Sequence, residues 1–395
     1  MNVVIALEHR FDRTPDGVVW TQTQFPYSFW KRYLEVFDHV RVVARVRDIS
    51  TLPPDFKEAN GDRVSFIAIP YYIGPVQYLL RSLQVKRVAQ QAVRTEDAVI
   101  LRVGSRIASC IEPKLRATNH PYAVEVVSDP YDVFAPGSIR HPLRPFLRWW
   151  SPQGLRRKCV GACAAAYVTK QALQARYPCP NYSVGISDVD ISEESLVFTP
   201  RQFHKVNTLN LIFVGTLAQL YKAPNILLNA VAICVQEGID LKLTMLGDGK
   251  HKTELEAQAA ALGLKERVCF RGQLAAGKAV ITELDQADLF VLPSYQEGLP
   301  RAMVEAMARA LPCIGSTVGG IPELLPPEDM VPPGDAAALA AKIREVVTNP
   351  ERMTRMSARN LEKAKEYKDE VLREQRIAFY SYVRKSTEIW LKTQK

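Results

Sequence analysis

Two glutamates with seven residues between them, Glu297 and Glu305, are the side chains of this sequence best placed to do chemistry. From residue 291 the chain reads Val-Leu-Pro-Ser-Tyr-Gln-Glu-Gly-Leu-Pro-Arg-Ala-Met-Val-Glu, which predicts a strand end, a turn and a helix start. Pro300 is expected in the first helical turn, where its fixed φ suits the helix and its missing N–H costs nothing. The free amides of that turn could bind an anion or a hydroxyl group. The spacing alone allows an acid/base pair as in glycoside hydrolysis, and equally two solvated acids.

Three other segments of the same half end a predicted strand with glycine and polar residues. In the first, Gly215 and Thr216 close the strand, and Lys222 at the next helix start can reach a phosphate. In the second, Gly247 and Asp248 form a tight strand-to-helix turn. A third segment, whose backbone could hydrogen-bond the edge of a base, comprises Arg271, Gly272 and Leu274. The first segment has an ordinary explanation as a solvated lysine at a helix start, and the second as a simple turn.

The apolar pattern predicts the strands that would bring these loops to one edge. In the first half, short apolar runs alternate with helical patterns, the runs being 3–7, 40–44, 64–69, 99–103, 122–127 and 165–169. In the second half the expected strands are 209–214, 241–246, 268–271 and 289–292, and the last long helix covers about 368–391. This alternation is typical of parallel sheets covered on both faces. We therefore predict an α/β fold with two doubly wound, Rossmann-like domains and a cleft between them, where ligands sit beyond the strands' carboxyl ends.

A polar stretch separates the two halves. Residues 181–208 are rich in Ser, Asp and Asn and break the alternation. Asp188 and Asp190 within it are explained as turn-forming acids of a linker rather than as a metal site. The predicted division is a first domain at 1–185, a linker at 186–206, a second domain at 207–366 and a final helix at 367–395.

The composition is typical of a soluble globular protein, with 47% hydrophobic and 24% charged residues. We find no apolar run of transmembrane length and no signal-peptide pattern, so we expect a cytoplasmic location. Seven scattered cysteines without a Cys-x-x-Cys pair favour free, buried thiols. Neither opening strand is followed by a Gly-x-Gly-x-x-Gly fingerprint, which weakens a dehydrogenase interpretation.

The net charge of +9 comes entirely from the first half of the chain. Residues 1–185 hold 25 Lys and Arg against 15 Asp and Glu (+10), and the remainder holds 26 against 27 (−1). Cations and aromatic residues mix at residues 140–150, which contain Trp149 and Trp150, and further cations follow at 156–158. This pattern suits an anionic membrane surface; the alternative is a solvated helix whose tryptophans pack inward. Because no nucleic-acid module accompanies the charge, nucleic acid is the weaker interpretation.

Taken together, residues 206–348 resemble the retaining, nucleotide-sugar-dependent glycosyltransferases of family 4, which have the two-domain GT-B architecture. The resemblance rests on the two glutamates, the Glu-Gly-Leu-Pro turn with its preceding Leu-Pro-Ser, and the loop Gly-Gly-Ile-Pro-Glu at 319–323. The first half resembles the family only in general layout. The final helix fits the family's crossover back onto the N-terminal, acceptor-side domain.

The resemblance implies separate roles for these residues. Glu297 is expected to contact hydroxyls of the donor sugar, with the amides near Gly298 and Leu299, and Glu305 to contact the nucleotide ribose. Lys222 is expected to neutralise the departing diphosphate, which supplies electrostatic stabilisation without a metal ion. No cofactor or metal is therefore expected.

One departure concerns the second cation of the family. Its usual position, directly after the strand-end glycine, holds Thr216 here, so Arg271 or Arg301 would have to substitute. The donor-binding set implied by the resemblance is Gly215, Thr216, Lys222, Gly247, Asp248, Arg271, Gly272, Leu274, Glu297, Gly298, Leu299, Pro300, Arg301 and Glu305. In the first domain, Gly17 stands where the family has a glycine-containing loop against the diphosphate, and Asp129 could orient the acceptor or cap a helix.

The sequence thus predicts a metal-independent, retaining glycosyltransferase. It would move a hexosyl unit from a UDP- or GDP-sugar to a hydroxyl of a saccharide or lipid-linked saccharide, in polysaccharide or glycolipid assembly. The alternatives are a nucleotide-sugar epimerase of similar shape and a non-catalytic relative acting as a partner subunit. An anionic membrane surface is an expected partner through the basic half, with the protein peripheral on the inner face of the membrane.

Overall fold

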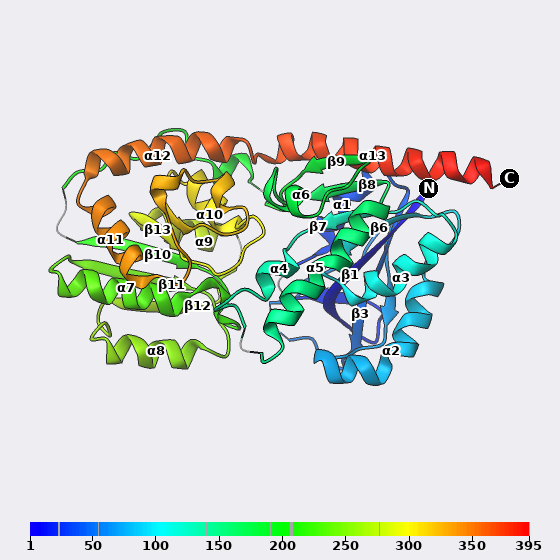
Figure 1. Ribbon diagram of the computed structural model, residues 1–395, viewed down its shortest axis with the longest axis horizontal. Helices are drawn as coiled ribbons and strands as arrows, with labels where there is room; N and C mark the ends of the chain where they lie inside the picture. The colour runs from blue at the N-terminus through cyan, green and yellow to red at the C-terminus, as the bar shows by residue number, and fades with distance from the viewer. Residues whose placement is uncertain are drawn as a thin grey trace. The chain divides into compact units, whose positions relative to one another are not determined.

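The computed structural model describes residues 1–22, 24–53, 55–139, 141–189, 191–205, 208–275 and 277–394. They form two compact units, whose ribbon is coloured along the chain in Figure 1. Unit 1 comprises Met1–Ser128, Pro152–Ile186 and Arg373–Lys395, and unit 2 comprises Asp129–Ser151 and Ser187–Leu372. Each unit is an α/β domain built on a mainly parallel sheet, which confirms the predicted fold class. Arg140, Asp190 and residues 206–207, all of which enter the sequence predictions, lie outside the described residues.

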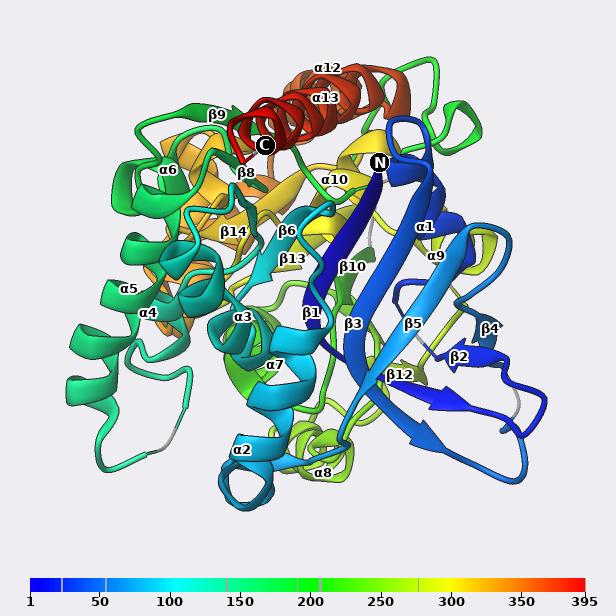
Figure 2. The same ribbon diagram turned by 90° about the vertical axis from the view of Figure 1, so that its right-hand side faces the viewer.

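The parallel strands of unit 1 follow the order β5-β3-β1-β6-β7-β8-β9. Their bounds are β1 Asn2–Arg13, β3 His39–Asp48, β5 Val64–Ile69, β6 Ala98–Val103, β7 Ala123–Val126, β8 Ala164–Tyr167 and β9 Tyr182–Gly185. Figure 2 shows β1, β3 and β5 side by side. All residues of β6 and β7 are buried, as expected for central strands with helices on both faces.

Two parts of this sheet differ from the predicted pattern. β1 continues to Arg13 rather than ending at residue 7, because its polar second half pairs antiparallel with β2 (Val19–Thr21), which in turn pairs with β4 (Lys57–Glu58). A register shift between Ala6 and Arg10 in the pairing with β3 marks the change. β9 lies in the polar stretch that begins at residue 181, yet it pairs in parallel with β8.

The helices of unit 1 include the long C-terminal one. Their bounds are α1 Tyr27–Leu34, α2 Gly74–Gln91, α3 Arg106–Ala117, α6 Ala172–Arg176 and α13 Asp369–Thr393, and α5 Arg144–Gly161 spans both units. α13 packs on unit 1 through aromatic rings: Tyr380 lies 4.6 Å from Tyr33, and Trp390 lies 4.4 Å from His120, between ring centroids. Such pairs stabilise beyond the apolar area that they bury.

Unit 2 has a parallel sheet in the order β12-β11-β10-β13-β14-β15. The strands are β10 Leu209–Val214, β11 Leu241–Leu246, β12 Val268–Gly272, β13 Leu289–Leu292, β14 Cys313–Ser316 and β15 Met330–Val331. The helices are α4 Pro130–Val133, α7 Pro224–Gln236, α8 Lys252–Ala261, α9 Lys278–Asp285, α10 Arg301–Ala308, α11 Ala336–Val347 and α12 Pro350–Lys365. Short 3₁₀ turns occur at Glu193–Ser195, Leu220–Lys222, Ile321–Glu323 and Pro327–Asp329.

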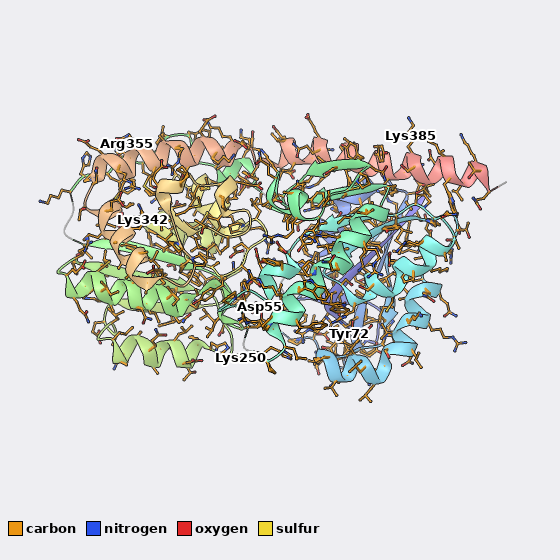
Figure 3. All side chains as sticks on the ribbon, viewed as in Figure 1. Asp55, Tyr72, Lys250, Lys342, Arg355 and Lys385 are labelled. Carbon is orange, nitrogen blue, oxygen red and sulfur yellow. The ribbon has the colours of Figure 1, made fainter. Side chains whose placement is uncertain are left out.

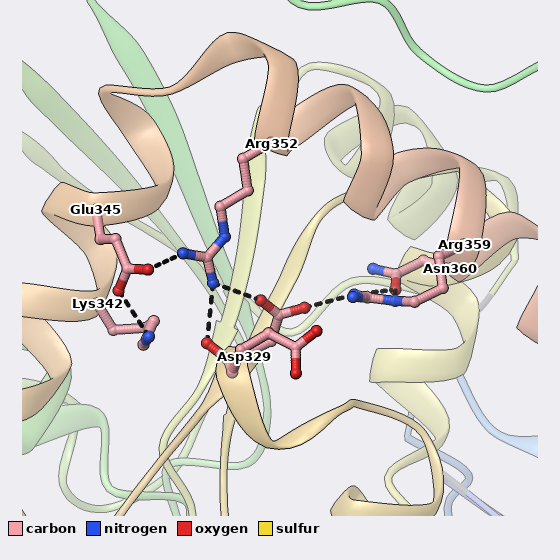
Figure 4. A network of polar contacts seen from close by, with 7 residues as sticks. Asp329, Lys342, Glu345, Arg352, Arg359 and Asn360 are labelled. Atoms are coloured by element: carbon pink, nitrogen blue, oxygen red, sulfur yellow. Dashed lines mark hydrogen bonds and ion pairs between the residues drawn. The ribbon is translucent and has the colours of Figure 1, made fainter.

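A buried carboxylate fastens α12 to the edge of this sheet (Figure 4). Asp329 is fully buried and accepts hydrogen bonds from Arg352 at 2.8 Å and from Arg359 at 2.5 Å. Arg352 also pairs with Glu345 of α11. Because a buried charge is tolerated only when it is paired, the two arginines fix the position of α12 against β15.

Two further expectations concern the whole chain. Within the described residues, no helix is both long and apolar enough to cross a membrane. All seven cysteines are free, as predicted, but Cys269 is exposed and Cys163 and Cys179 are only partly buried. Burial raises the pKa of Cys159 and of Cys163 to about 12, so both thiols stay protonated and unreactive at neutral pH.

Candidate functional site

Most predicted site residues of unit 2 lie at the carboxyl ends of its strands or in the loops that follow, and Arg301 and Glu305 lie on α10. In the strand order β12-β11-β10-β13-β14-β15, successive strands are added from β10 towards β12 on one side and from β13 towards β15 on the other. The loops that follow these two neighbouring strands therefore diverge, which is the position where open α/β sheets bind ligands. The loop after β10 carries Lys222, and the loop after β13 carries Glu297.

A buried ion pair joins these two loops. The Nζ atom of Lys222 donates to Oε1 of Glu297 at 2.8 Å, and the side chains are only 13% and 8% exposed. Ser294, which is fully buried, donates its hydroxyl to the same Oε1 at 2.7 Å. The main chain supports the contact, since the Tyr295 amide donates to the Tyr221 carbonyl at 2.7 Å. A cation and a carboxylate that are 75 residues apart in sequence are thus held together.

The electrostatics of Lys222 favour its charged form. Burial alone would lower its pKa, but the Glu297 carboxylate and the neighbouring Tyr221 reverse this effect and raise the pKa above its ordinary value. Lys222 is therefore an ammonium ion at neutral pH. Such a charge in a partly desolvated loop can stabilise an incoming anion more strongly than it would in water.

Gly215 makes room for this lysine at the end of β10. A Cβ atom at position 215 would lie 2.3 Å from Cδ of Lys222, so a larger residue would displace the lysine. On the other side of Glu297, the Gly319–Gly320 loop packs against its backbone. The Gly320 amide donates to the Gly298 carbonyl at 2.6 Å, and a Cβ at Gly319 would lie 2.0 Å from the Glu297 carbonyl oxygen. Position 319 therefore requires glycine, because the clash there is with backbone and φ is +53°.

Glu305 lies on the second turn of α10, where burial raises the pKa of its carboxyl group and Arg301 partly opposes the change. Among the described residues, no hydrogen bond or ion pair engages this carboxylate. Pro300 precedes α10 as its N-cap, with ψ of 104°, rather than occupying the first turn as predicted. Its carbonyl accepts the amides of Met303 and Val304 at 3.1 and 3.3 Å.

The comparison with known families agrees with this geometry. Residues 199–363 match the family model described as glycosyl transferases group 1. This part of the chain is a glycosyl transferases group 1 domain. The activity of the chain is therefore glycosyl transfer, as the sequence predicts, and the domain coincides with the strands and loops of unit 2 that carry Lys222, Glu297 and Glu305.

One relative and two solved structures extend the likeness beyond the glycosyl transferases group 1 domain. Protein CapJ of Staphylococcus aureus is 27% identical over 326 residues, which are 82% of this chain and 81% of CapJ. Sucrose-phosphate synthase from Thermosynechococcus elongatus has a TM-score of 0.70 at 15% identity, covering 98% of this chain and 99% of that one. Anabaena HepE, solved in complex with UDP-glucose, has a TM-score of 0.64 at 16% identity, covering 96% and 98%. At these identities the two structures show a shared fold.

The other predicted donor residues of the glycosyl transferases group 1 domain occupy neighbouring loops. Thr216 accepts the Ala218 amide at 3.1 Å through its hydroxyl, so it forms a local turn. Gly247 donates its amide to the Gly272 carbonyl at 2.8 Å, which joins the β11 and β12 loops. Asp248 accepts the Gly249 amide at 2.7 Å. Leu274 follows β12 and is partly exposed.

The two arginines proposed as substitute cations differ in their surroundings. Both are exposed, but Arg271 donates to Glu283 at 2.8 Å, so its charge is already paired. Arg301 influences the pKa values of Lys222, Tyr221 and Glu305. Of the two, Arg301 is therefore the cation whose charge reaches the loops of the glycosyl transferases group 1 domain.

The predicted residues of the first half lie in ordinary structural positions. Gly17 is the left-handed residue (φ 85°) of the turn that joins β1 to β2. Asp129 is the N-cap of α4 and accepts the Tyr131 amide at 2.8 Å, so the structure shows the helix-capping alternative. His120 is buried, with its ring nitrogens 2.8 and 3.1 Å from backbone carbonyls of Pro121 and Thr95.

In α5 the alternative with inward-packed tryptophans is wrong. Trp149 and Trp150 are 64% and 51% exposed, and Phe146 stacks on Trp150 with 6.5 Å between ring centroids. The guanidinium of Arg148 lies 4.0 Å from the Tyr131 ring centroid. The membrane interpretation of this stretch stays a prediction.

Two residues that contact Glu297 are absent from the predicted site residues. Ser294 donates its hydroxyl to the Glu297 carboxylate, and Gly319 lies against the Glu297 carbonyl; in the sequence both are only members of motifs. The signal that could have found both is their place in loops that follow adjacent parallel strands, β13 and β14. Within the described part of the chain, no three His, Cys, Asp or Glu side chains are grouped so that they could hold a metal ion.

Proposed function

We propose that this protein transfers a hexosyl unit from a UDP-sugar to a hydroxyl of a saccharide or lipid-linked saccharide, with retention of configuration and without a metal ion. The observation that carries the proposal is the 2.8 Å contact between Lys222 and Glu297 at the strand-end edge of unit 2. It brings a cation suited to a diphosphate next to a carboxylate suited to sugar hydroxyls. Both belong to a glycosyl transferases group 1 domain.

In this proposal the ion pair is the resting arrangement of the site. When a donor binds, the ammonium group of Lys222 turns to the diphosphate, and Glu297 accepts hydrogen bonds from the sugar. Ser294 keeps the carboxylate oriented after its cation has moved, because its hydroxyl donates at 2.7 Å independently of Lys222. Charge-assisted bonds of this kind are about twice as strong as neutral ones.

Glu305 is proposed to hold the ribose. Its carboxyl group is partly buried and makes no hydrogen bond or ion pair within the described residues, and two hydroxyl donors would offset the cost of that burial. In this proposal Glu297 binds the sugar and Glu305 binds the ribose of the same donor molecule.

We propose Arg301 as the second cation, in place of the arginine that Thr216 replaces. Its effect on the pKa of Lys222 supports this role, while the ion pair between Arg271 and Glu283 argues against Arg271. Arg301→Ala is expected to reduce transfer about tenfold, and Arg271→Ala serves as the matched control with little effect.

The proposed reaction needs no protein base. The bond between the sugar C1 and the diphosphate oxygen breaks, the acceptor oxygen bonds C1 on the same face, and the acceptor proton passes to the departing phosphate. Lys222 and Arg301 stabilise the negative charge that develops on the diphosphate. The two cations thus stabilise the charge on the leaving group, as a divalent metal ion does in metal-dependent enzymes.

A panel of nucleotide sugars tests the donor. The solved complex of HepE with UDP-glucose supports a UDP-sugar, so UDP-sugars are expected to bind and to hydrolyse slowly without an acceptor. If only GDP-sugars bind, the proposed base of the donor, uracil, is wrong and guanine replaces it. Conversion of a UDP-sugar to an epimer without release of UDP would overturn the proposed transfer. The site assignment fails if Glu297→Ala and Lys222→Ala leave UDP release unchanged.

A further inference from the structure

The outer face of α2 in unit 1 carries an apolar stripe. Val76, Leu79, Leu80 and Leu83 occupy positions i, i+3, i+4 and i+7, so they share one face of the helix. They are 69%, 69%, 83% and 84% exposed. Single exposed leucines need no explanation, but four in register form a continuous apolar surface, and Ile73, exposed by 51%, lies just before the helix.

The opposite face of α2 is already anchored to unit 1. Val85 and Ala89 are buried, and the Tyr78 ring lies 5.2 Å from that of Tyr72, which Figure 3 labels. Gln90 donates to the Cys110 carbonyl of α3 at 3.1 Å. The buried face alone therefore anchors α2 to unit 1, and the apolar stripe is available to bind another surface.

Cations lie beside the stripe and acids are absent from its surroundings in sequence. Lys86 and Arg87 follow Leu83 on the next turn, and both are exposed. From residue 64 to residue 95 the sequence has four cations, Arg81, Lys86, Arg87 and Arg94, and no Asp or Glu. An apolar stripe with flanking cations matches the boundary between acyl chains and anionic headgroups.

We propose that α2 docks the protein on an anionic phospholipid surface. Val76, Leu79, Leu80 and Leu83 enter the acyl boundary, and Lys86 and Arg87 bind headgroup phosphates. The size of the stripe favours lipid over a protein partner, because a stable protein interface takes about 20–30 residues from each side. A helix lying in a membrane surface needs only one apolar face. This goes beyond the proposed transfer reaction and does not depend on it.

Flotation with lipid vesicles tests the proposal on the full chain. Vesicles of phosphatidylcholine with phosphatidylglycerol are compared with vesicles of phosphatidylcholine alone, at low and high salt. The wild type is expected to float with the anionic vesicles, less so at high salt. Leu80→Gln/Leu83→Gln is expected to weaken this binding about tenfold or more, and Lys86→Gln/Arg87→Gln to remove its salt dependence.

Phe198→Gln is the matched control, because Phe198 is 99% exposed and lies in unit 2, and it is expected to leave flotation unchanged. A loss of flotation in Trp149→Gln/Trp150→Gln with none in the α2 variants would overturn the assignment to α2. Equal flotation with anionic and neutral vesicles, or no flotation with either, would overturn the proposal that α2 binds an anionic surface. A dimer in sedimentation velocity that Leu80→Gln/Leu83→Gln dissociates would show that a second copy covers the stripe instead. UDP-sugar hydrolysis is measured on the same variants, so loss of transfer and loss of docking are read separately.

Discussion

The ion pair between Lys222 and Glu297 can be tested by removing its charges one at a time. Lys222→Met keeps most of the buried volume and leaves Glu297 with Ser294 as its remaining side-chain donor. Breaking a buried pair costs about 3–5 kcal/mol, because the remaining charge stays desolvated. We expect a value of about 3 kcal/mol, at the lower end of that range, since the serine hydroxyl still donates to Glu297.

Stability and activity should then separate in the double variant Lys222→Met/Glu297→Gln. No unpaired charge remains in it, so it is expected to be more stable than Lys222→Met by at least ~1 kcal/mol. Its transfer rate should stay about 10²–10³-fold below the wild type, as for loss of one electrostatic group at a transition state. Recovery of stability without recovery of transfer would show that the charges of this pair act on the reaction beyond their contribution to stability.

Urea unfolding measures the first quantity, and release of UDP in the presence of acceptor measures the second. Lys365→Met is the matched control, because Lys365 pairs with Glu362 on the surface and such pairs contribute only about 0–1 kcal/mol. Strict additivity of the two substitutions in stability would refute the coupling between them. A transfer rate within tenfold of the wild type in Lys222→Met would refute the role in leaving-group stabilisation.

Two further predictions concern neighbouring residues. Because burial raises the folded-state pKa of Glu305, its charge costs stability as the pH rises through that pKa, so Glu305→Gln should be more stable than the wild type at pH 7 and lose this advantage in acid. The same variant should bind UDP about 10–100-fold more weakly in calorimetry, and unchanged affinity would contradict the ribose role. Gly319→Ala should slow transfer strongly, since its Cβ would lie 2.0 Å from the Glu297 carbonyl oxygen. Gly263→Ala has a comparable left-handed φ with nothing within 4 Å of its Cβ, so equal effects of the two on transfer would show that backbone strain, not displacement of Glu297, is responsible.

Much of the fold is readable from the sequence because parallel strands buried on both faces are continuous apolar runs. Strands such as β6 and β10 therefore coincide with their predicted ranges within a residue. The antiparallel β2 and β4 are only three and two residues long, and their pairing depends on a partner outside their own pattern. β9 was hidden for the same reason, since it is an edge strand with partly exposed residues.

For the candidate site, sequence motifs give the residues but not their contacts. Glu297 and Lys222 are recognisable from their turns, yet the 2.8 Å distance between them depends on which strands are neighbours in the sheet. The capping role of Asp129 and the exposure of Trp149 depend likewise on packing that no local pattern specifies.

The contribution of α13 to unit 1 has a consequence for how the chain is made. The last segment of unit 1 begins at Arg373, 187 positions after Ile186 closes the preceding one. At about 5–20 residues per second, translation takes on the order of 10–40 s to cross that interval. Until then Tyr33 and His120 lack the rings of Tyr380 and Trp390 that cover them in the finished protein. The nascent first unit therefore remains incomplete on the ribosome, with apolar surface exposed to solvent, while the residues of the second unit are synthesised.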